Sequence, residues 1–162
     1  MLRSLIIFAG SYLFIANILA AGILWWTLNK DERTKLAARF VIASMMAVIL
    51  AKAGGALFYD PRPFVVHHFV PLIPHAADNG FPSDHTELTM LLALLCYPYS
   101  KWAGLALGVI SIAVGSARIA AGIHSLPDIT GSIVFAVLSV ILGVIVAPKL
   151  TCTSCMNIPS GK

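Results

Sequence analysis

Long apolar stretches dominate the chain and are separated by short polar segments. Four of them are long enough to cross a membrane as α-helices, at about residues 2–28, 36–59, 102–122 and 129–146. A fifth apolar run, 86–97, is short for a crossing unless it begins at Ser83 or enters at an angle. The pattern predicts an all-α integral membrane bundle of about five to six transmembrane helices.

The composition agrees with a membrane protein. Of the 162 residues, 59% are apolar and 11% are charged, whereas soluble domains have roughly 45–50% apolar residues. The sequence has no internal repeat or Gly/Ser linker, so we expect one membrane domain over 1–150 and a polar tail over 151–162. The first apolar run lacks a small-residue cleavage site followed by polar chain, so we expect a retained helix.

The basic residues sort by membrane side. The formal net charge is +4, but the cations do not cluster as a nucleic-acid-binding face does, and no nucleic-acid partner is expected. When five spans are threaded in order, seven cations fall on one side: Lys30, Arg33, Lys35, Arg39, Lys101, Lys149 and Lys162. Short cytoplasmic loops are rich in Lys and Arg, so the other side, with Arg3, Arg62 and Arg118, is expected to face outward.

The three cysteines add little to the prediction. Cys96 lies in an apolar run and is expected to fill the core. Cys152 and Cys155 form a lone Cys-x-x-Cys pair in the polar tail, without nearby partners for a metal or redox site. No cofactor is expected from them.

A fixed cation, an imidazole and a carboxylate follow one another at the end of the third long run, 102–122, and just after it. Gly122 is expected to end the helix that carries Arg118, and Pro127 fits the first turn of a new helix. His124 and Asp128 then lie about one turn apart. If Asp128 accepts the proton of one ring nitrogen, the other nitrogen is free to act as nucleophile or base. A structural ion cluster at the membrane surface explains these three residues equally well.

A second polar group lies at the end of the second run. Lys52 sits inside the span, where a lysine either faces a polar cavity or extends to the surface. Pro61 and Pro63 end the helix and hold Arg62 just outside the membrane. The mostly apolar segment 64–73 is expected to form an interfacial lid that contacts lipid. Three histidines of this loop are expected at the surface and not as zinc ligands: His67, His68 and His75.

A third group precedes the short apolar run. Ser83 or Asp84 is expected to cap the helix, with Glu87 completing a capping box with Asp84. Capping does not explain His85, which has no preference for this position. Because a helix N-terminus binds anions, we expect His85 to lie where a phosphate is held.

Together, the three groups resemble the signature motifs of the type 2 phosphatidic acid phosphatase superfamily, in their usual order. The matching residues are Lys52 with Arg62-Pro63, then Pro82-Ser83-Asp84-His85, then Arg118, His124 and Asp128. They cover about half of the chain, from Lys52 to Asp128. Asp84 in place of the usual glycine, and Arg62-Pro63-Phe64, are similar to bacterial undecaprenyl diphosphate phosphatases of the bacitracin-resistance type.

The resemblance implies a mechanism and a location. His124 would attack phosphorus and form a phosphohistidine, Asp128 would orient it, and His85 would protonate the leaving group. Phosphate oxygens would be bound by Lys52, Arg62, Ser83, Arg118 and the backbone of Asp84. No metal is required in this family. The reading is hydrolysis of undecaprenyl diphosphate to the monophosphate at the outer face of the bacterial cytoplasmic membrane, which recycles the cell-wall lipid carrier.

The chain departs from the family pattern at three positions. Nine residues separate Lys52 from Arg62 where the family usually has six, which keeps the face of the lysine but moves it back by ~4.5 Å. Ala117 replaces the usual serine before Arg118, and one possible hydrogen bond to phosphate is lost. Asp84 would repel an anion unless its carboxylate turns away.

Three alternatives remain at the level of sequence. The substrate could be another lipid phosphate, such as phosphatidylglycerol phosphate or phosphatidic acid. A small transporter could use Lys52, Arg118, His124 and Asp128 as an ion path. A metal-dependent hydrolase could use His85, His124 and Asp128 as ligands. The sequence leaves the lipid tail and the oligomeric state open.

Overall fold

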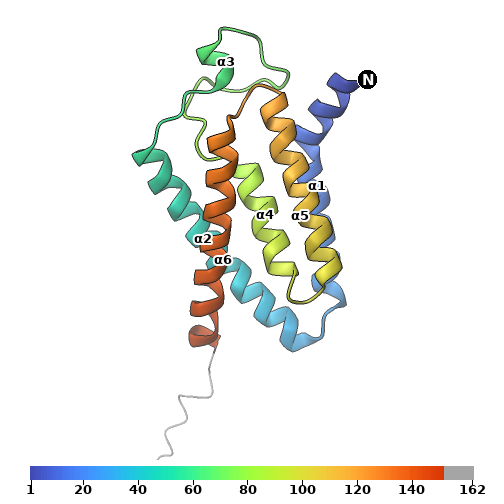
Figure 1. The fold of residues 1–162 in the computed structure, drawn as a ribbon. Helices are drawn as coiled ribbons and strands as arrows, with labels where there is room; N and C mark the ends of the chain where they lie inside the picture. The colour runs from blue at the N-terminus through green and yellow to red at the C-terminus, as the bar shows by residue number, and fades with distance from the viewer. Residues whose placement is uncertain (152–162) are drawn as a thin grey trace, which may run out of the picture.

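The computed structural model describes residues 1–151 as a bundle of α-helices (Figure 1). The helices are α1 (Leu2–Thr27), α2 (Lys30–Leu57), α3 (Pro63–Val66), α4 (Asp84–Cys96), α5 (Lys101–Ala120) and α6 (Leu126–Thr151). Over these residues the chain contains no β-strand, and the predicted all-α bundle is confirmed. Cys152, Cys155 and nearly all of the predicted tail, 151–162, lie outside the described residues.

The short helix α4 occupies the centre of the bundle. It has 13 residues and packs against α1, α2, α5 and α6. The other four long helices are long and apolar enough to cross a membrane. The apolar run that is short for a membrane crossing, 86–97, thus forms the central helix. Its neighbours bury it on most sides.

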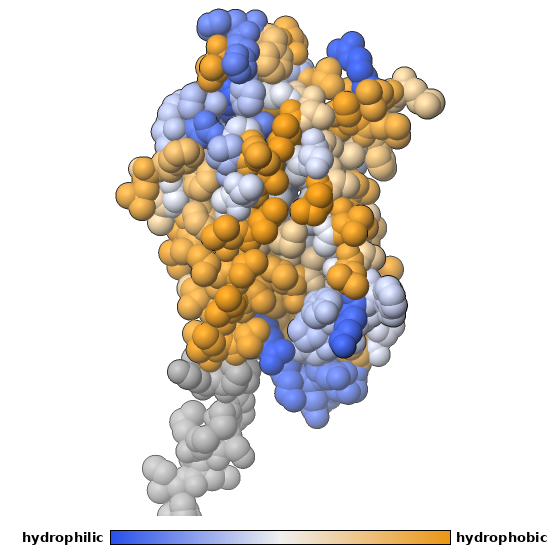
Figure 2. Space-filling model, viewed as in Figure 1, coloured by the Kyte–Doolittle hydropathy of each residue, from blue (hydrophilic) through white to orange (hydrophobic). Residues whose placement is uncertain are grey.

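The outer surface of the bundle suits a lipid environment. Figure 2 shows a broad hydrophobic belt between two hydrophilic ends. Large apolar side chains are exposed on the outward faces of several helices, among them Leu19, Ile23, Trp102, Val109, Val134 and Ile145. Exposure of these apolar faces to water would be unfavourable, whereas exposure to the hydrocarbon of a membrane is not. The helices also satisfy their backbone N–H and C=O groups by internal hydrogen bonds, as a membrane requires.

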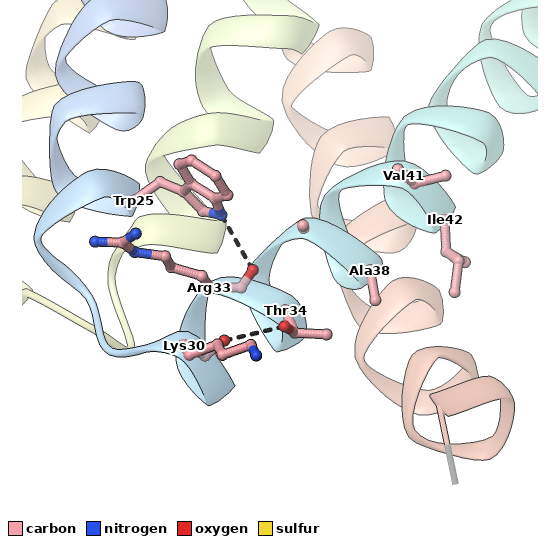
Figure 3. A pocket seen from close by; sticks show the side chains of 8 residues that line it. Trp25, Lys30, Arg33, Thr34, Ala38, Val41 and Ile42 are labelled. Carbon is pink, nitrogen blue, oxygen red and sulfur yellow. Dashed lines mark hydrogen bonds between the residues drawn. The ribbon is translucent and has the colours of Figure 1, made fainter. Parts of the chain in front are cut away.

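Aromatic and basic residues gather at the turn between α1 and α2. The Arg33 guanidinium lies 5.6 Å from the ring centroid of Trp25 and 5.2 Å from that of Trp26. The Trp25 indole N–H donates to the Arg33 carbonyl (3.1 Å), beside a shallow hollow between the two helices (Figure 3). Tryptophan next to cations is typical of a membrane–water interface.

The ends of the helices form two groups. The α1–α2 turn, the α4–α5 turn and the end of α6 lie at one end of the bundle; the loop with α3 and the α5–α6 connection lie at the other (Figure 1). Five of the seven predicted one-sided cations belong to the first end: Lys30, Arg33, Lys35, Arg39 and Lys101. The side chain of Lys149 and all of Lys162 fall outside the part that the structure describes.

Polar contacts tie α1 to the central helices. The Asn17 side chain is fully buried, and its Nδ2 donates to the carbonyls of Thr89 in α4 and Leu107 in α5, both at 3.2 Å. Thr89 Oγ1 and Ser111 Oγ lie 2.9 Å apart across the α4–α5 interface. These bonds fix the position of α1 against a core that otherwise consists of small and apolar side chains.

Replacement of Asn17 by leucine should destabilise the bundle. Two backbone carbonyls lose their side-chain donor, and we expect a loss of about 1–2 kcal/mol in folding free energy. The check is the unfolding temperature of the purified protein in detergent. Thr130→Val, on an exposed face of α6, is the control and should leave that temperature unchanged; equal effects of both substitutions would contradict the role of Asn17.

Candidate active site

Parts of all three predicted motifs meet in one cavity. It has a volume of about 690 Å³ and lies below the loop with α3. Its polar wall includes six of the eight predicted site residues: Lys52, Arg62, Asp84, His85, Arg118 and His124. Its apolar wall comes from α2 and α4, with Ala47, Val48 and Leu91.

His124, in the connection before α6, and Asp128, in the first turn of α6, form the predicted pair. His124 Nδ1 lies 3.1 Å from Asp128 Oδ2, which also accepts the backbone N–H of Ser125 at 2.8 Å. Gly122 ends α5 with a positive φ of 78°, which favours glycine. Since a carboxylate only accepts hydrogen bonds, Nδ1 carries the ring proton and Nε2 presents its lone pair to the cavity.

Two arginines flank the free nitrogen of His124. Arg62 Nη1 lies 3.4 Å and Arg118 Nη2 3.3 Å from His124 Nε2. Both side chains are nearly buried, with 5% and 4% of their surface exposed. An anion in front of His124 would therefore meet two guanidinium groups that can bind phosphate oxygens.

Backbone and side-chain acceptors hold Arg62 in place. Its Nε donates to Asp78 Oδ1 (2.7 Å), Nη1 to the Ile123 carbonyl (2.8 Å) and Nη2 to the Asn79 carbonyl (3.3 Å). The Arg62 bond keeps the pKa of Asp78 below its ordinary value. With every nitrogen engaged, the guanidinium is fixed before any ligand binds.

The first helix helps to hold Arg118. Arg118 Nη1 donates to the carbonyl of Gly10 in α1 at 2.9 Å. Its Nη2 lies 3.5 Å from His75 Nε2 as well as near His124. A segment more than a hundred residues away in the chain thus contributes to the site.

The surroundings keep His124 neutral. Burial lowers the pKa of His124 below its ordinary value; the hydrogen bond with Asp128 opposes this, and the charges of Arg118 and Arg62 add to the lowering. A neutral imidazole with a free lone pair can act as a nucleophile.

His85 lies in the first turn of α4 and lines the same cavity. Its ring makes an edge contact with Phe14 of α1, with centroids 4.8 Å apart. Burial, together with the charges of Arg118, His124 and His75, lowers the pKa of His85 to about 4. Without an anion in the cavity, His85 is therefore neutral near pH 7.

The structure does not bring the Ser83 hydroxyl to the cavity. Ser83 is fully buried, and its Oγ lies 3.1 Å from Thr86 Oγ1. Its backbone N–H donates to Ser132 Oγ (2.7 Å), which also lies 2.6 Å from the Asp128 carbonyl. Ser83 thus joins α4 to α6 behind His124, and its predicted phosphate contact stays a prediction.

The predicted capping box at the start of α4 is wrong. Ser83 is the N-cap residue, but no side chain makes the capping hydrogen bond. Asp84 is exposed and lines the cavity, and Glu87 is buried one turn further along. The Glu87 carboxylate is directed into the bundle, because α4 enters the core immediately after its first residues.

Lys52 reaches the cavity from α2. Its side chain is exposed and makes no hydrogen bond or ion pair within the described residues. The sequence left two alternatives for this lysine, a polar cavity or the surface. In the structure the side chain lines the cavity and is also exposed.

Sequence reasoning missed a histidine and an asparagine. His75, expected at the surface, is exposed but also lines the cavity, with its ring centroid 6.2 Å from that of His124. Burial, followed by the charges of Arg62 and Arg118, lowers its pKa. No local pattern marks His75 within the loop, so the sequence could not have identified it.

Asn79 organises the loop that carries Arg62. Its Oδ1 accepts the backbone N–H of Asp60 and of Phe81, both at 3.0 Å. Its Nδ2 donates to the carbonyls of Gly55 (2.9 Å) and Phe58 (3.0 Å) at the end of α2. The Asn-Gly pair is a turn signal in the sequence, and it could have identified this position.

The loop also approaches the His124–Asp128 pair closely. A Cβ atom at Gly80 would lie 2.8 Å from Asp128 Oδ2 and 3.1 Å from the Asp60 carbonyl oxygen. Asp60 Oδ2 accepts a hydrogen bond from the Ser125 hydroxyl, next to His124. Only glycine fits at position 80, where the loop passes against Asp128.

Within residues 1–151, no group of three or more His, Cys, Asp and Glu side chains is arranged to hold a metal ion. The alternative ligand set of His85, His124 and Asp128 is therefore not formed there.

Comparisons with known proteins place these motifs in a family. The family model of the PAP2 superfamily matches residues 35–152. The chain is 34% identical over 153 residues to a Bacillus licheniformis protein named bacitracin transport permease protein BcrC, covering 93% of this chain and 74% of that protein. It is 31% identical over 137 residues to the undecaprenyl-diphosphatase BcrC of Bacillus subtilis (strain 168), covering 85% and 70%.

Anion binding should raise the pKa of His85. We expect a value of about 4 in the free protein, because burial, the charge of Arg118 and the neighbouring His124 and His75 oppose its protonation. Vanadate in the cavity adds negative charge and should shift the pKa upward. The measurement is an NMR titration of labelled histidine, with His85→Gln to assign the signal; an ordinary pKa in the free protein, or no shift with vanadate, would contradict this picture.

Proposed function

Because the chain belongs to the PAP2 superfamily, we propose that it hydrolyses undecaprenyl diphosphate to undecaprenyl phosphate and inorganic phosphate. The single observation that carries the proposal is the unprotonated Nε2 of His124, which faces Arg62 and Arg118, with Asp128 bound to the opposite ring nitrogen. This arrangement offers a neutral nucleophile and two fixed cations at the same point.

The first step is attack on the terminal phosphate. The lone pair of His124 Nε2 forms a bond to phosphorus while the bond from phosphorus to the bridging oxygen breaks. The bridging oxygen leaves with the electron pair on the lipid monophosphate, and His85 gives it a proton. Asp128 stabilises the positive charge that develops on the His124 ring.

The second step releases the phosphate. Water attacks the phosphohistidine as the phosphorus–nitrogen bond breaks and its electron pair returns to His124. His85, now neutral, accepts a proton from the attacking water. Arg62 and Arg118 neutralise the phosphate oxygens in both steps, which is the main requirement of phosphoryl transfer.

The protonation of His85 depends on the substrate. In the free protein its pKa is about 4, first because of burial and then because of nearby cations. A diphosphate adds negative charge beside these cations and favours protonated His85. The general acid is thereby charged when substrate is bound.

The shape of the cavity supports a lipid substrate. Its polar end contains the arginines and histidines, and its other wall, between α2 and α4, is formed by Ala47, Val48 and Leu91. A phosphate attached to a hydrocarbon chain matches this distribution. Exposed apolar residues of the loop, such as Val70 at 90%, would contact the membrane above it.

The charge distribution supports an outward-facing site. The described cations Lys30, Arg33, Lys35, Arg39 and Lys101 lie at the end of the bundle opposite the cavity, and that end belongs in the cytoplasm by the positive-inside rule. The site then faces the periplasm or cell exterior of a bacterial cytoplasmic membrane. Release of phosphate there would recycle the lipid carrier of peptidoglycan synthesis, with bacitracin resistance as a consequence; the name of the Bacillus licheniformis relative mentions bacitracin.

Removal of either histidine should abolish phosphate release. With undecaprenyl diphosphate, detergent and excess chelator, we expect His124→Ala to lose at least about 10³-fold in kcat and His85→Ala about 100-fold or more. His67→Ala, an exposed histidine of the same loop, is the matched control and should retain activity. Loss of wild-type activity in chelator would favour a metal-dependent hydrolase, and release only from other lipid phosphates would change the substrate.

Replacement of Arg62 by lysine tests whether positive charge alone suffices or whether the hydrogen bonds of the guanidinium group are also needed. Lysine keeps the charge but cannot reproduce the three bonds of the guanidinium, so we expect kcat/KM to fall by about 10- to 100-fold. The measurement is steady-state phosphate release, with Arg3→Lys as a control on the exposed start of α1. An Arg62→Lys protein with full activity would show that positive charge alone suffices.

A further inference from the structure

One buried carboxyl group on the cavity wall has no part in the steps above. Glu87 of α4 has 4% of its surface exposed and lines the cavity. Its Oε1 is buried without any hydrogen-bond partner. A carboxyl group in this state is unfavourable by itself, and the cavity in front of it is where a ligand could supply the missing partner.

The surroundings of Glu87 favour its protonated form. α4 is not one of the four helices long enough to span the membrane. Burial, and then the charge of Asp84, raise the pKa of Glu87 to about 7. A protonated carboxyl group can donate a hydrogen bond to a phosphate oxygen, and such a bond to a charged acceptor is strong.

The position along α4 places Glu87 between the two ends of the cavity. Asp84 and His85 belong to the polar end, and Leu91 belongs to the apolar wall. With 1.5 Å of rise per residue, Glu87 lies about 4.5 Å further along the helix axis than Asp84 and about 6 Å before Leu91. It therefore sits where the head of a lipid gives way to its tail.

Lys52 of α2 lines the same cavity as Glu87. It follows Val48 and Ala51 of the apolar wall and precedes the loop that carries Arg62. The nine residues between Lys52 and Arg62 set the lysine back from Arg62 along the helix. The groups whose charges act on His124 are Arg118, Arg62 and Asp128, so the terminal phosphate has its cations without Lys52.

We propose that Glu87 and Lys52 form a second subsite, which holds the lipid-linked phosphate of a diphosphate while His124 attacks the terminal phosphate. This inference rests on the proposed function. Lys52 neutralises the inner phosphate, and Glu87 donates a hydrogen bond to one of its oxygens. A lipid monophosphate fills only the first subsite, so the chain prefers lipid diphosphates.

A matched pair of substrates tests the subsite. Farnesyl diphosphate and farnesyl monophosphate have the same tail, and kcat/KM is measured for both in detergent. For Glu87→Leu and Lys52→Met we expect kcat/KM to fall about tenfold or more with the diphosphate and to stay within about threefold with the monophosphate. Glu87→Gln, which still donates a hydrogen bond, should keep most of the preference.

The controls lie on α2 at the far end of the bundle. Glu32→Gln and Lys35→Met remove the same chemical groups away from the cavity and should leave the ratio of the two kcat/KM values unchanged. If Glu87→Leu does not fold, Lys52→Met decides, because that side chain is exposed.

The outcomes distinguish the two proposals. A wild-type protein that releases phosphate from neither lipid refutes the proposed function and the subsite with it. Hydrolysis of both lipids, with a ratio that the Glu87 and Lys52 variants leave unchanged or with parallel losses on both substrates, overturns the subsite alone.

Discussion

The burial of two like charges beside one imidazole nitrogen is the constraint on which the site depends. Arg62 and Arg118 both approach His124 Nε2 within hydrogen-bond distance, although they repel each other and are almost fully removed from water. Such a pair persists only if other groups hold it. Asp78 and the carbonyls of Gly10, Asn79 and Ile123 hold the two arginines. A bound phosphate would relieve the repulsion that remains between them.

The loop between α2 and α4 is built around this requirement. Asn79 closes it onto the end of α2, and Gly80 lets it pass against Asp128. The backbone N–H of Phe64 and of Leu72 donate to the carbonyls of Gly122 and Ala121, so the loop is also fixed to the α5–α6 connection. His124 and both arginines are thus positioned before a ligand arrives, as the proposed electrostatic catalysis needs.

Much of the fold and of the candidate site could be predicted from the sequence, because the spacing of residues and the stiffness of the chain determine them. The helices follow from the length of the apolar runs, and the His124–Asp128 contact follows from the four-residue spacing between the connection after Gly122 and the first turn of α6. The position of His75 could not be predicted, since no period or capping rule applies within residues 58–83. Glu87 misled because its spacing from Asp84 fits a capping box equally well, and only the packing of α4 decides which way its carboxylate turns.

The contact between Arg118 and the Gly10 carbonyl has a mechanical consequence. α1 lies outside the segment that matches the family, residues 35–152, yet it supplies an acceptor for Arg118 and the Phe14 ring that packs on His85. A spanning helix tilts to match the thickness of the hydrocarbon layer around it. A tilt of α1 would displace the Gly10 carbonyl, and with it the acceptor that holds Arg118 beside His124, so the thickness of the bilayer would act on the position of this arginine.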